Sequence, residues 1–415
     1  MKLYPVKQAL ALLCVSLPIA VHALPATTET AASPSWLMQQ INKNPEVIAA
    51  KENLNAVFSL TEGQKKSLYN PELATDVSRE GQFNNFTIGI NQTIDLWDKR
   101  DQRSKKADFQ LAQAKQTFSY LIQEKTAEAL KALVNYQKSQ MQAKIAREKE
   151  QQLDTLLNLV AKRQQAGDVS QVDAELTSLS LSQTLNTSAQ AQVQLANAKA
   201  KVIELMPDWT SSIHILPTQG IAIDRYKIDE LTTTQWLQQH PLVQMAKLQW
   251  QISKSDASQA LLATKADPTF GVNAGKTNND NTLGLSFSMP LNVRNNFSSE
   301  ARAANQQANA VESQLQSVLR KQKFAIQATT ESVLAYKNHY QRWQKLMQGR
   351  DKRIADLLQK QWQSGDINTS EYLLALQQRA EGLLAGIELQ SQFKLNQIDW
   401  LLAIGQIDIA LKILK

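Results

Sequence analysis

The sequence predicts a mainly α-helical protein with a small β part, built from two similar halves. Long windows rich in Ala, Gln, Leu, Lys and Glu contain almost no Gly or Pro, which is typical of long helices. Two short segments alternate apolar and polar residues, which is typical of strands. The same succession of signals occurs twice in the same order, which indicates an internal repeat.

Residues 1–23 are predicted to be a signal peptide. Lys2 and Lys7 supply a short positive region, and an apolar run of signal-peptide length extends from Ala9 to Ala20. Val21-His22-Ala23 then offers a small-residue cleavage site. We therefore expect secretion across the inner membrane of a bacterium.

The cysteine count and the net charge narrow the classes of function. The only cysteine, Cys14, lies in the apolar run, and its bulky neighbour Leu13 argues against lipidation. A mature chain that begins at Leu24 would contain no cysteine, which excludes disulfides and thiolate metal sites. The chain has 45 basic and 38 acidic residues, and loss of the two lysines lowers the net charge from +7 to +5. This small, dispersed surplus does not indicate nucleic acid as a partner.

After residue 24 no stretch approaches the roughly 18–20 continuous apolar residues that a membrane-spanning helix needs. The most apolar later segment, Trp400–Leu414, is interrupted by Gln406, Asp408 and Lys412. If the chain crosses a membrane, we expect it to do so by strands.

The first half, residues 24–212, is expected to run helix, strand hairpin, very long helix, tight turn and helix. The hairpin covers about 72–96, the long helix about 99–165 and the turn at the tip about 166–169. From Asp101 to Ala166 there is neither Gly nor Pro. A helix of this length spans on the order of 100 Å, which implies a coiled coil or a helical barrel.

The second half, residues 229–415, is expected to follow the same plan. Its hairpin covers about 269–291, its long helix about 298–363 and its tip turn about 364–367. Residues 213–228, which include Pro217 and Gly220, are predicted to be the connector between the halves.

Four sequence matches define the repeat, and matched residues lie 195 to 198 positions apart. Four matches in one order are hard to obtain by chance. They pair Asn44-Pro45 with His240-Pro241, Asn70-Pro71 with Asp267-Pro268, Thr87-Ile88-Gly89-Ile90 with Thr282-Leu283-Gly284-Leu285, and Ala166-Gly167-Asp168-Val169 with Ser364-Gly365-Asp366-Ile367.

The two hairpins alternate apolar and polar residues over lengths near the 9–11 residues of a tilted membrane strand. A soluble sheet on a core is the alternative, but the flanking helices are polar and too long to supply a covering apolar layer. Four strands cannot close a barrel, and open sheet edges are not tolerated in hydrocarbon. Several protomers are therefore expected to share one barrel in a cyclic assembly.

With this layout the sequence resembles the TolC family of outer-membrane efflux proteins over essentially the whole mature chain. The resemblance implies a homotrimer in the bacterial outer membrane, with a twelve-stranded barrel continued by a long α-helical barrel into the periplasm. Short motifs resemble the CzcC-like branch, which pairs with pumps for heavy-metal cations. They are Tyr69-Asn70-Pro71-Glu72-Leu73, Gln92-Thr93-Ile94-Asp95-Leu96 and Lys99-Arg100.

The resemblance implies a passive exit duct and not an enzyme. Its expected partners are a periplasmic adaptor, an inner-membrane pump of the RND type and outer-membrane lipid, and its expected cargo is a heavy-metal cation. One alternative is a TolC-type channel for drugs or type I secretion. Another is a soluble periplasmic coiled-coil scaffold, which would explain the long helices but not two alternating hairpins in equivalent places.

The family's tip motif, a glycine turn followed six residues later by an acid, is present twice. Asp173 follows Gly167, and Glu371 follows Gly365. The resemblance implies that these acids narrow and gate the periplasmic mouth. It also implies that the tip turns, Gly167-Asp168 and Gly365-Asp366, contact the adaptor. The sequence departs from relatives that carry an aromatic–arginine latch, because Trp362 and Ile367 stand there.

Plain structural roles compete with these assignments. Asp168 and Asp366 are expected to cap the helices that follow them. Asp173 and Glu371 lie one turn into those helices, where the helix dipole favours an acid, but threefold symmetry would also turn each into a cation-selecting ring. The sequence is compatible with both roles.

Trp97, with Lys99 and Arg100, suits a membrane boundary, and a solvated helix start is the alternative. We expect no catalytic site, cofactor or metal site. The segment 271–277 is one residue short of a phosphate loop and lies on a strand. The mature histidines, His214, His240 and His339, are scattered and lack ligand partners at metal-binding spacing.

Overall fold

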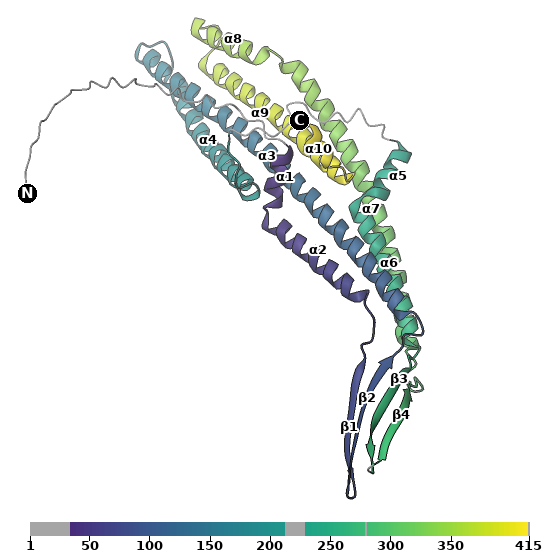
Figure 1. The fold of residues 1–415 in the computed structure, drawn as a ribbon. Helices are drawn as coiled ribbons and strands as arrows, with labels where there is room; N and C mark the ends of the chain where they lie inside the picture. Colours follow the sequence, from purple (N-terminus) through teal and green to yellow (C-terminus); the bar gives the residue numbers. More distant parts are fainter. Residues whose placement is uncertain (1–33, 212–228, 279, 414–415) are drawn as a thin grey trace, which may run out of the picture.

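The computed structural model describes residues 34–211, 229–278 and 280–413. The predicted signal peptide and the predicted connector, 213–228, lie outside these residues. The described chain is mainly helical with one small antiparallel sheet, which confirms the predicted fold class. Figure 1 shows an elongated molecule with the sheet at one end and paired helices at the other.

The first half contains α1 (Pro34–Asn42), α2 (Pro45–Gln64), β1 (Glu72–Glu80), β2 (Phe83–Thr93), α3 (Lys99–Gln165) and α4 (Gln171–Leu205). Helix α3 is continuous over 67 residues. It extends from the sheet junction to the far tip, where the chain reverses into α4 (Figure 1).

The second half contains α5 (Glu230–Gln239), α6 (Pro241–Ala263), β3 (Thr269–Thr277), β4 (Asp280–Ser288), α7 (Ser298–Met347), α8 (Arg350–Ser364), α9 (Thr369–Ala403) and α10 (Asp408–Ile413). The single long helix expected over about 298–363 is wrong, because the chain breaks between α7 and α8. Gln348 leaves the helical region with ψ 115°, and Gly349 follows in the left-handed region with φ 66°.

The four strands form one sheet in the order β1-β2-β3-β4, with all neighbours antiparallel. β2 and β3 join the two hairpins, with Ile90 opposite Val272. β2 ends at Thr93, before the expected hairpin boundary. The carboxylate of Asp95 then accepts hydrogen bonds from the backbone N–H groups of Lys99 (2.9 Å) and Arg100 (2.8 Å) at the start of α3. β4 likewise ends at Ser288, two residues before Pro290, which has no N–H to donate.

Two separate clusters of buried apolar residues hold the helices together. The larger cluster lies where α1, α5 and the ends of α4 and α9 pack on the middle of α3 and α7. Within it, the ring of Trp400 lies edge-on to that of Trp236, with ring centres 5.8 Å apart. The smaller lies at the tip and consists of Leu153, Leu156, Val160, Trp362 and Leu376. Among the described residues no helix is long and apolar enough to cross a membrane.

Candidate functional site: the two-faced sheet and the helical tip

The sheet has two chemically different faces. Successive side chains of a strand point to opposite sides, and the strand register assigns each residue to one face. One face is apolar and exposed: Leu73 is 70% and Leu285 is 85% exposed. Its members also include Val77, Phe86, Ile88, Ile90, Phe270, Val272, Leu283 and Phe287. The other face carries mostly Gly, Ala, Ser, Thr and Asn together with acids.

Charge is divided between the two faces. The acids of the strands, Glu72, Asp76, Glu80 and Asp280, all fall on the polar face. The bases of the strands, Arg79 and Lys276, both fall on the apolar face. The polar face is therefore a negatively charged wall.

Glycines keep the polar wall flat. A Cβ added at Gly284 would lie 2.3 Å from Oδ1 of Asn273, and one added at Gly271 would lie 2.0 Å from Oδ1 of Asn91. The asparagine side chains therefore lie across the glycines instead of projecting from the sheet. Larger residues at these glycines would push polar side chains away from the wall.

Both outer strands of the sheet have an unpaired edge in the described chain, because β1 pairs only with β2 and β4 only with β3. Every residue of β1 is exposed. Open, exposed strand edges are templates for pairing with another chain.

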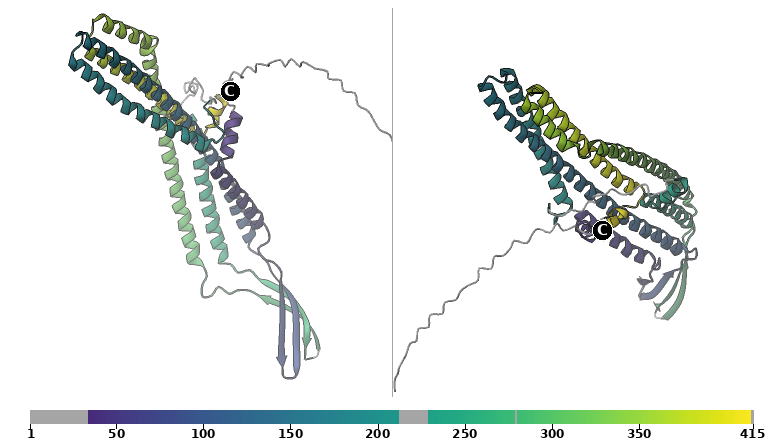
Figure 2. Two further views of the ribbon diagram at one scale, coloured as in Figure 1. Left: turned by 90° about the vertical axis from the view of Figure 1, so that its left-hand side faces the viewer. Right: turned by 90° about the horizontal axis from the view of Figure 1, so that it is seen from above.

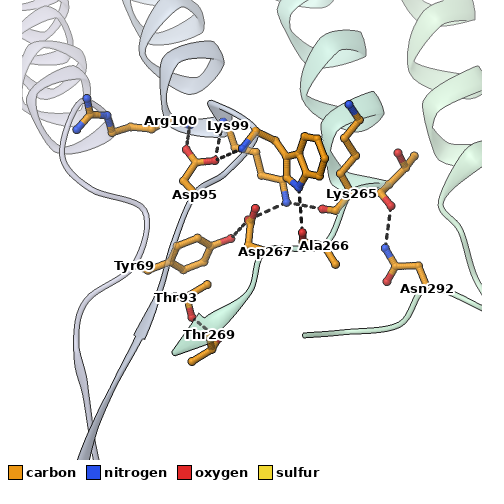
Figure 3. Close-up of polar contacts among 12 residues, drawn as sticks. Tyr69, Thr93, Asp95, Lys99, Arg100, Lys265, Ala266, Asp267, Thr269 and Asn292 are labelled. Carbon is orange, nitrogen blue, oxygen red and sulfur yellow. Dashed lines mark hydrogen bonds and ion pairs between the residues drawn. The ribbon is translucent and has the colours of Figure 1, made fainter. Parts of the chain in front are cut away.

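A polar network joins the sheet to the helices (Figure 3). The side chain of Asp267 is only 3% exposed. Its Oδ2 accepts hydrogen bonds from the Tyr69 hydroxyl (2.6 Å) and from Nζ of Lys99 (2.8 Å). The hydrogen bond to Asp267 and partial burial raise the pKa of Tyr69 to about 12. This network ties the first residue of α3 to the segments that precede β1 and β3.

The three residues predicted to lie at a membrane boundary have different surroundings. Trp97 donates from Nε1 to the Ala266 carbonyl (2.9 Å), and Nζ of Lys265 lies 4.4 Å from the centre of its ring. The side chain of Lys99 turns inward to Asp267 and is 20% exposed. Arg100 is exposed. All three lie at the end of the sheet, but only Trp97 and Arg100 present side chains to the surroundings.

The two tip turns have the same geometry. Gly167 has φ 82° and Gly365 has φ 84°, a left-handed conformation that suits glycine at the end of a helix. The N–H groups of Asp168 and Asp366 donate back to helix carbonyls at 2.9 Å. The expectation that Asp168 and Asp366 cap the following helices is therefore wrong, because their backbone N–H groups still hydrogen-bond to carbonyls of the preceding helices, α3 and α8.

Ser170 and Asn368 are the N-caps of the following helices, α4 and α9. The predicted acids, Asp173 and Glu371, lie three residues after them. Ser170 Oγ accepts from the N–H of Asp173 at 3.1 Å and donates to its carboxylate at 2.8 Å. Asn368 and Glu371 form a reciprocal capping box at 2.8 and 2.9 Å. Ser370 Oγ also donates to Oδ1 of Asp173 at 3.3 Å, so the two tips touch. Both acids thus stabilise helix starts, and at the tip Glu371 is exposed and Asp173 is partly exposed.

An aromatic–arginine contact exists at the tip, although it does not use the residue at position 367. The guanidinium carbon of Arg163 lies 4.6 Å from the ring centre of Trp362, which is buried. Tyr372 stacks on the same indole at 5.3 Å. Sequence reasoning missed this contact because the arginine comes from the other half of the chain.

The structure offers no metal centre in the parts of the chain that it describes, where no three His, Cys, Asp or Glu side chains gather. His240 begins α6, and its ring nitrogens contact the N–H of Leu242 and the carbonyl of Leu402. His214 lies outside the described residues.

Comparisons with known proteins agree with this geometry. The sequence profile of the outer membrane efflux protein family matches residues 36–206. The fold is similar to that of CusC, at 14% identity and TM-score 0.73, covering 91% of this chain and 92% of that one. OprN, an outer-membrane channel, gives 14% identity and TM-score 0.76 over 90% and 89% of the two chains. The CmeC outer membrane channel of Campylobacter jejuni has 14% identity and a TM-score of 0.73, covering 95% of this chain and 94% of that one. A search of curated protein sequences finds no significant match.

Proposed function

We propose, on the premise that this chain belongs to the outer membrane efflux protein family and has the TolC-type fold, that it is the outer-membrane channel of a tripartite efflux system. The channel is a homotrimer that acts as a passive exit duct. Its sheet lies in the bacterial outer membrane, and its long helices extend into the periplasm. It performs no chemistry on its cargo.

The observation that carries this proposal is the two-faced sheet with two open edges. The exposed apolar face suits lipid, and the polar face suits a water-filled lumen. Four strands are too few to close around a lumen, and unpaired backbone groups at β1 and β4 are costly in hydrocarbon. Pairing of β1 with β4 of a neighbouring chain resolves both problems in a closed ring.

The proposed cargo is a heavy-metal cation. The polar wall carries carboxylates and no base, so three copies would surround the lumen with negative charge. The CzcC-like motifs agree with this cargo, although Tyr69 and Lys99 are engaged with Asp267 and so build the junction instead of binding cargo. A TolC-type channel for drugs or type I secretion is the second candidate.

The proposed partners are a periplasmic adaptor and an inner-membrane pump of the RND type. The tip turns, Gly167-Asp168 and Gly365-Asp366, are exposed at the end of the helices and are the proposed adaptor contacts. Asp173 and Glu371 lie one turn away. In a trimer they would supply six carboxylates around the periplasmic mouth and restrict it. Trp97 and Arg100 are proposed to lie at the membrane boundary.

Sizing in detergent with light scattering tests the assembly, and we expect a mass of three chains. A monomer that stays soluble without detergent would favour the periplasmic scaffold and overturn the channel proposal.

Ion selectivity in planar bilayers tests the charged wall. Replacement of the wall acids, as Glu72→Gln, Asp76→Asn and Asp280→Asn, should lower the preference for cations. The matched control, Arg79→Gln with Lys276→Gln, changes charge on the opposite face and should leave selectivity unchanged. Equal effects of the two variants would show that the polar face does not line the lumen, and a parent channel without cation preference would favour the drug or secretion channel.

A further inference from the structure

The strands of the sheet carry two basic side chains, Arg79 and Lys276, and both lie on the exposed apolar face. Val77 is directly opposite Phe86, and Phe86 is directly opposite Lys276, so these three side chains share that face. Arg79 lies two residues beyond Val77 and points to the same side. Each hairpin therefore contributes one base to the apolar face.

Both bases lie at the hairpin end of this face and not in its middle. Arg79 is the last residue but one of β1, and Lys276 is the last residue but one of β3. From there toward the helices the face is mostly apolar, as far as Phe270 and Phe287. The left view of Figure 2 shows the hairpin turns at the end of the sheet farthest from the helices. The two bases therefore mark one edge of the apolar band.

This edge offers hydrogen-bond donors and no carboxylate. Asn84 is directly opposite Arg79, Asn281 is directly opposite Lys276, and all four side chains are exposed. We call these four residues the hairpin rim. The acids of the strands lie on the other face, and among the described residues no acid forms an ion pair with either rim base. A neighbouring copy adds no carboxylate to this face of the sheet, because its strands divide charge in the same way.

Two lysines at the helix end of the sheet are, in contrast, engaged within the chain. Nζ of Lys99 donates to the buried carboxylate of Asp267 at 2.8 Å and to the Lys265 carbonyl at 2.6 Å. The ammonium group of Lys265 lies over the ring of Trp97. Within the described part of the chain the two rim bases have no partner of either kind, so their charges can pair with a group from outside the protein.

The position of the rim bases suits the boundary between hydrocarbon and headgroups. A base on a lipid-facing strand is costly at the middle of a bilayer and tolerated near its surface, where long side chains extend their charged ends to the headgroups. Arginine pairs with phosphate through parallel hydrogen bonds, and lysine pairs with it as a point charge. Strand spacing places the Cα atoms of Arg79 and Lys276 about 12 Å apart, so both side chains can reach one headgroup.

We propose that the hairpin rim binds a phosphorylated lipid headgroup in the membrane leaflet at the hairpin ends. Arg79 and Lys276 neutralise the phosphate, and the amides of Asn84 and Asn281 donate to oxygens of the headgroup. Phe86, which is exposed between the bases, packs against the acyl chains. This inference rests on the proposed channel function, because it requires the apolar face to lie in lipid. Each chain supplies one such site.

Mass spectra of the intact protein released from detergent test the rim, because one spectrum gives both the number of chains and the number of bound lipids. The probes are lipid A with two phosphates and the same lipid with both phosphates removed, at equal concentrations. Each base near a membrane surface contributes about fivefold to the binding of an anionic lipid, so we expect the phosphorylated form to bind about 25-fold more tightly. Equal binding of the two forms would overturn the proposal.

Charge variants then locate the site. Arg79→Gln with Lys276→Gln should abolish the preference for the phosphorylated lipid, and each single variant should lower it about fivefold. Arg353→Gln with Lys360→Gln is the matched control, because it removes one exposed arginine and one exposed lysine from α8, at the opposite end of the molecule (Figure 1). The control should leave the preference unchanged.

A charge-conserving swap guards against misfolding. Arg79→Lys with Lys276→Arg keeps both charges at the rim and should keep most of the preference. The assembly mass in each spectrum shows whether a variant has assembled as the parent does. A preference that survives Arg79→Gln with Lys276→Gln in an assembly of parental mass would overturn the rim as the binding site.

Inorganic phosphate in large excess distinguishes a lipid site from a site for a free anion. It should not displace the phosphorylated lipid, because acyl chains against the apolar face hold the headgroup at the rim. Complete displacement would indicate a free-anion site and overturn the lipid proposal.

The same spectra separate this inference from the channel function on which it rests. Three chains that show no preference for the phosphorylated lipid would reject the rim and leave the channel standing. A monomer that stays soluble without detergent would reject the channel and, with it, the lipid site.

Discussion

The α3–α4 pair and the α7–α8–α9 arm follow one plan but differ in the continuity of their long helix. Each ends in a glycine turn, begins its return helix with a side-chain cap and has an acid at the third helical position. The first pair contains no glycine between residue 99 and its tip turn, or in α4. The second has glycines at 349, 382 and 386 within the same span.

The difference teaches that a duplicated chain can keep one layout while its two copies build the long helix differently. An α-helix is stiff while every residue continues its hydrogen bonds and its side chains pack. In the second arm Gly349 interrupts the helix, and the ring of Trp343 packs against Gly386 of the return helix. The other long helix, α3, is continuous over 67 residues, so the two halves share one layout while only the second interrupts its long helix.

Removal of the tip indole should have the largest effect. Trp362 is 4% exposed, whereas its counterpart 198 residues earlier, Gln164, is exposed. Trp362→Ala should lower the free energy of unfolding of the tip by about 3–5 kcal/mol, since a large buried side chain is lost. Gln164→Ala should change it little. Hydrogen exchange of tip amides measures both, and equal effects would contradict an asymmetric tip core.

Filling the space beneath Trp343 should have the next largest effect. Gly386→Val places atoms where the indole ring lies and should cost about 1–3 kcal/mol of stability. Gly382→Ala, where the space is open, should not destabilise the chain. Thermal unfolding followed by circular dichroism compares them. Similar melting temperatures for the two variants would show that Trp343 does not depend on Gly386.

The two helix caps should differ modestly. Asn368→Ala removes a reciprocal capping box and should cost about 1 kcal/mol, and Ser170→Ala should cost the same or less. The expected readout is faster amide exchange confined to the first turn of α9 or α4. Faster exchange throughout both helices would instead indicate that the caps hold the tips together.

Neutralising the tip acids should have the smallest effect on stability. Asp173→Asn with Glu371→Gln should change stability by only about 0.3–1 kcal/mol, because acids in the first turn act mainly through the helix dipole. If the acids restrict the mouth, the double variant should show lower cation selectivity and weaker block by divalent ions in planar bilayers. Unchanged selectivity and block would show that both acids serve only to begin helices.

Some features of the site follow from local sequence alone. Alternation in the hairpins is enough to predict the two faces of the sheet, because side chains of a strand point alternately to opposite sides. The turns at Gly167 and Gly365 are predicted by glycine between long helical segments. The capping residues were predicted two positions too early, at Asp168 and Asp366. Acids, amides and hydroxyls can all cap a helix. Which residue becomes the N-cap depends on where the hydrogen bonds of the preceding helix end.

The break at Gly349 could not be predicted in the same way. A glycine inside a helix costs only about 1 kcal/mol, so the local sequence is compatible with both a continuous and a broken helix. The packing of Trp343 over Gly386 and the pair of Arg379 with Asp351 accompany the broken form. These contacts join residues 28 to 43 positions apart, on different helices.

By itself, the sequence determined the helical character, the repeat and the two-faced strands of this protein, because these depend on periodicity within a few residues. Only the tertiary structure decided that Arg163 covers Trp362, that Asp267 is held by Tyr69 and Lys99, and that one arm is broken. Each of these depends on residues from different elements meeting at a few ångströms. Such contacts are set by the packing of whole helices, and no local pattern encodes them.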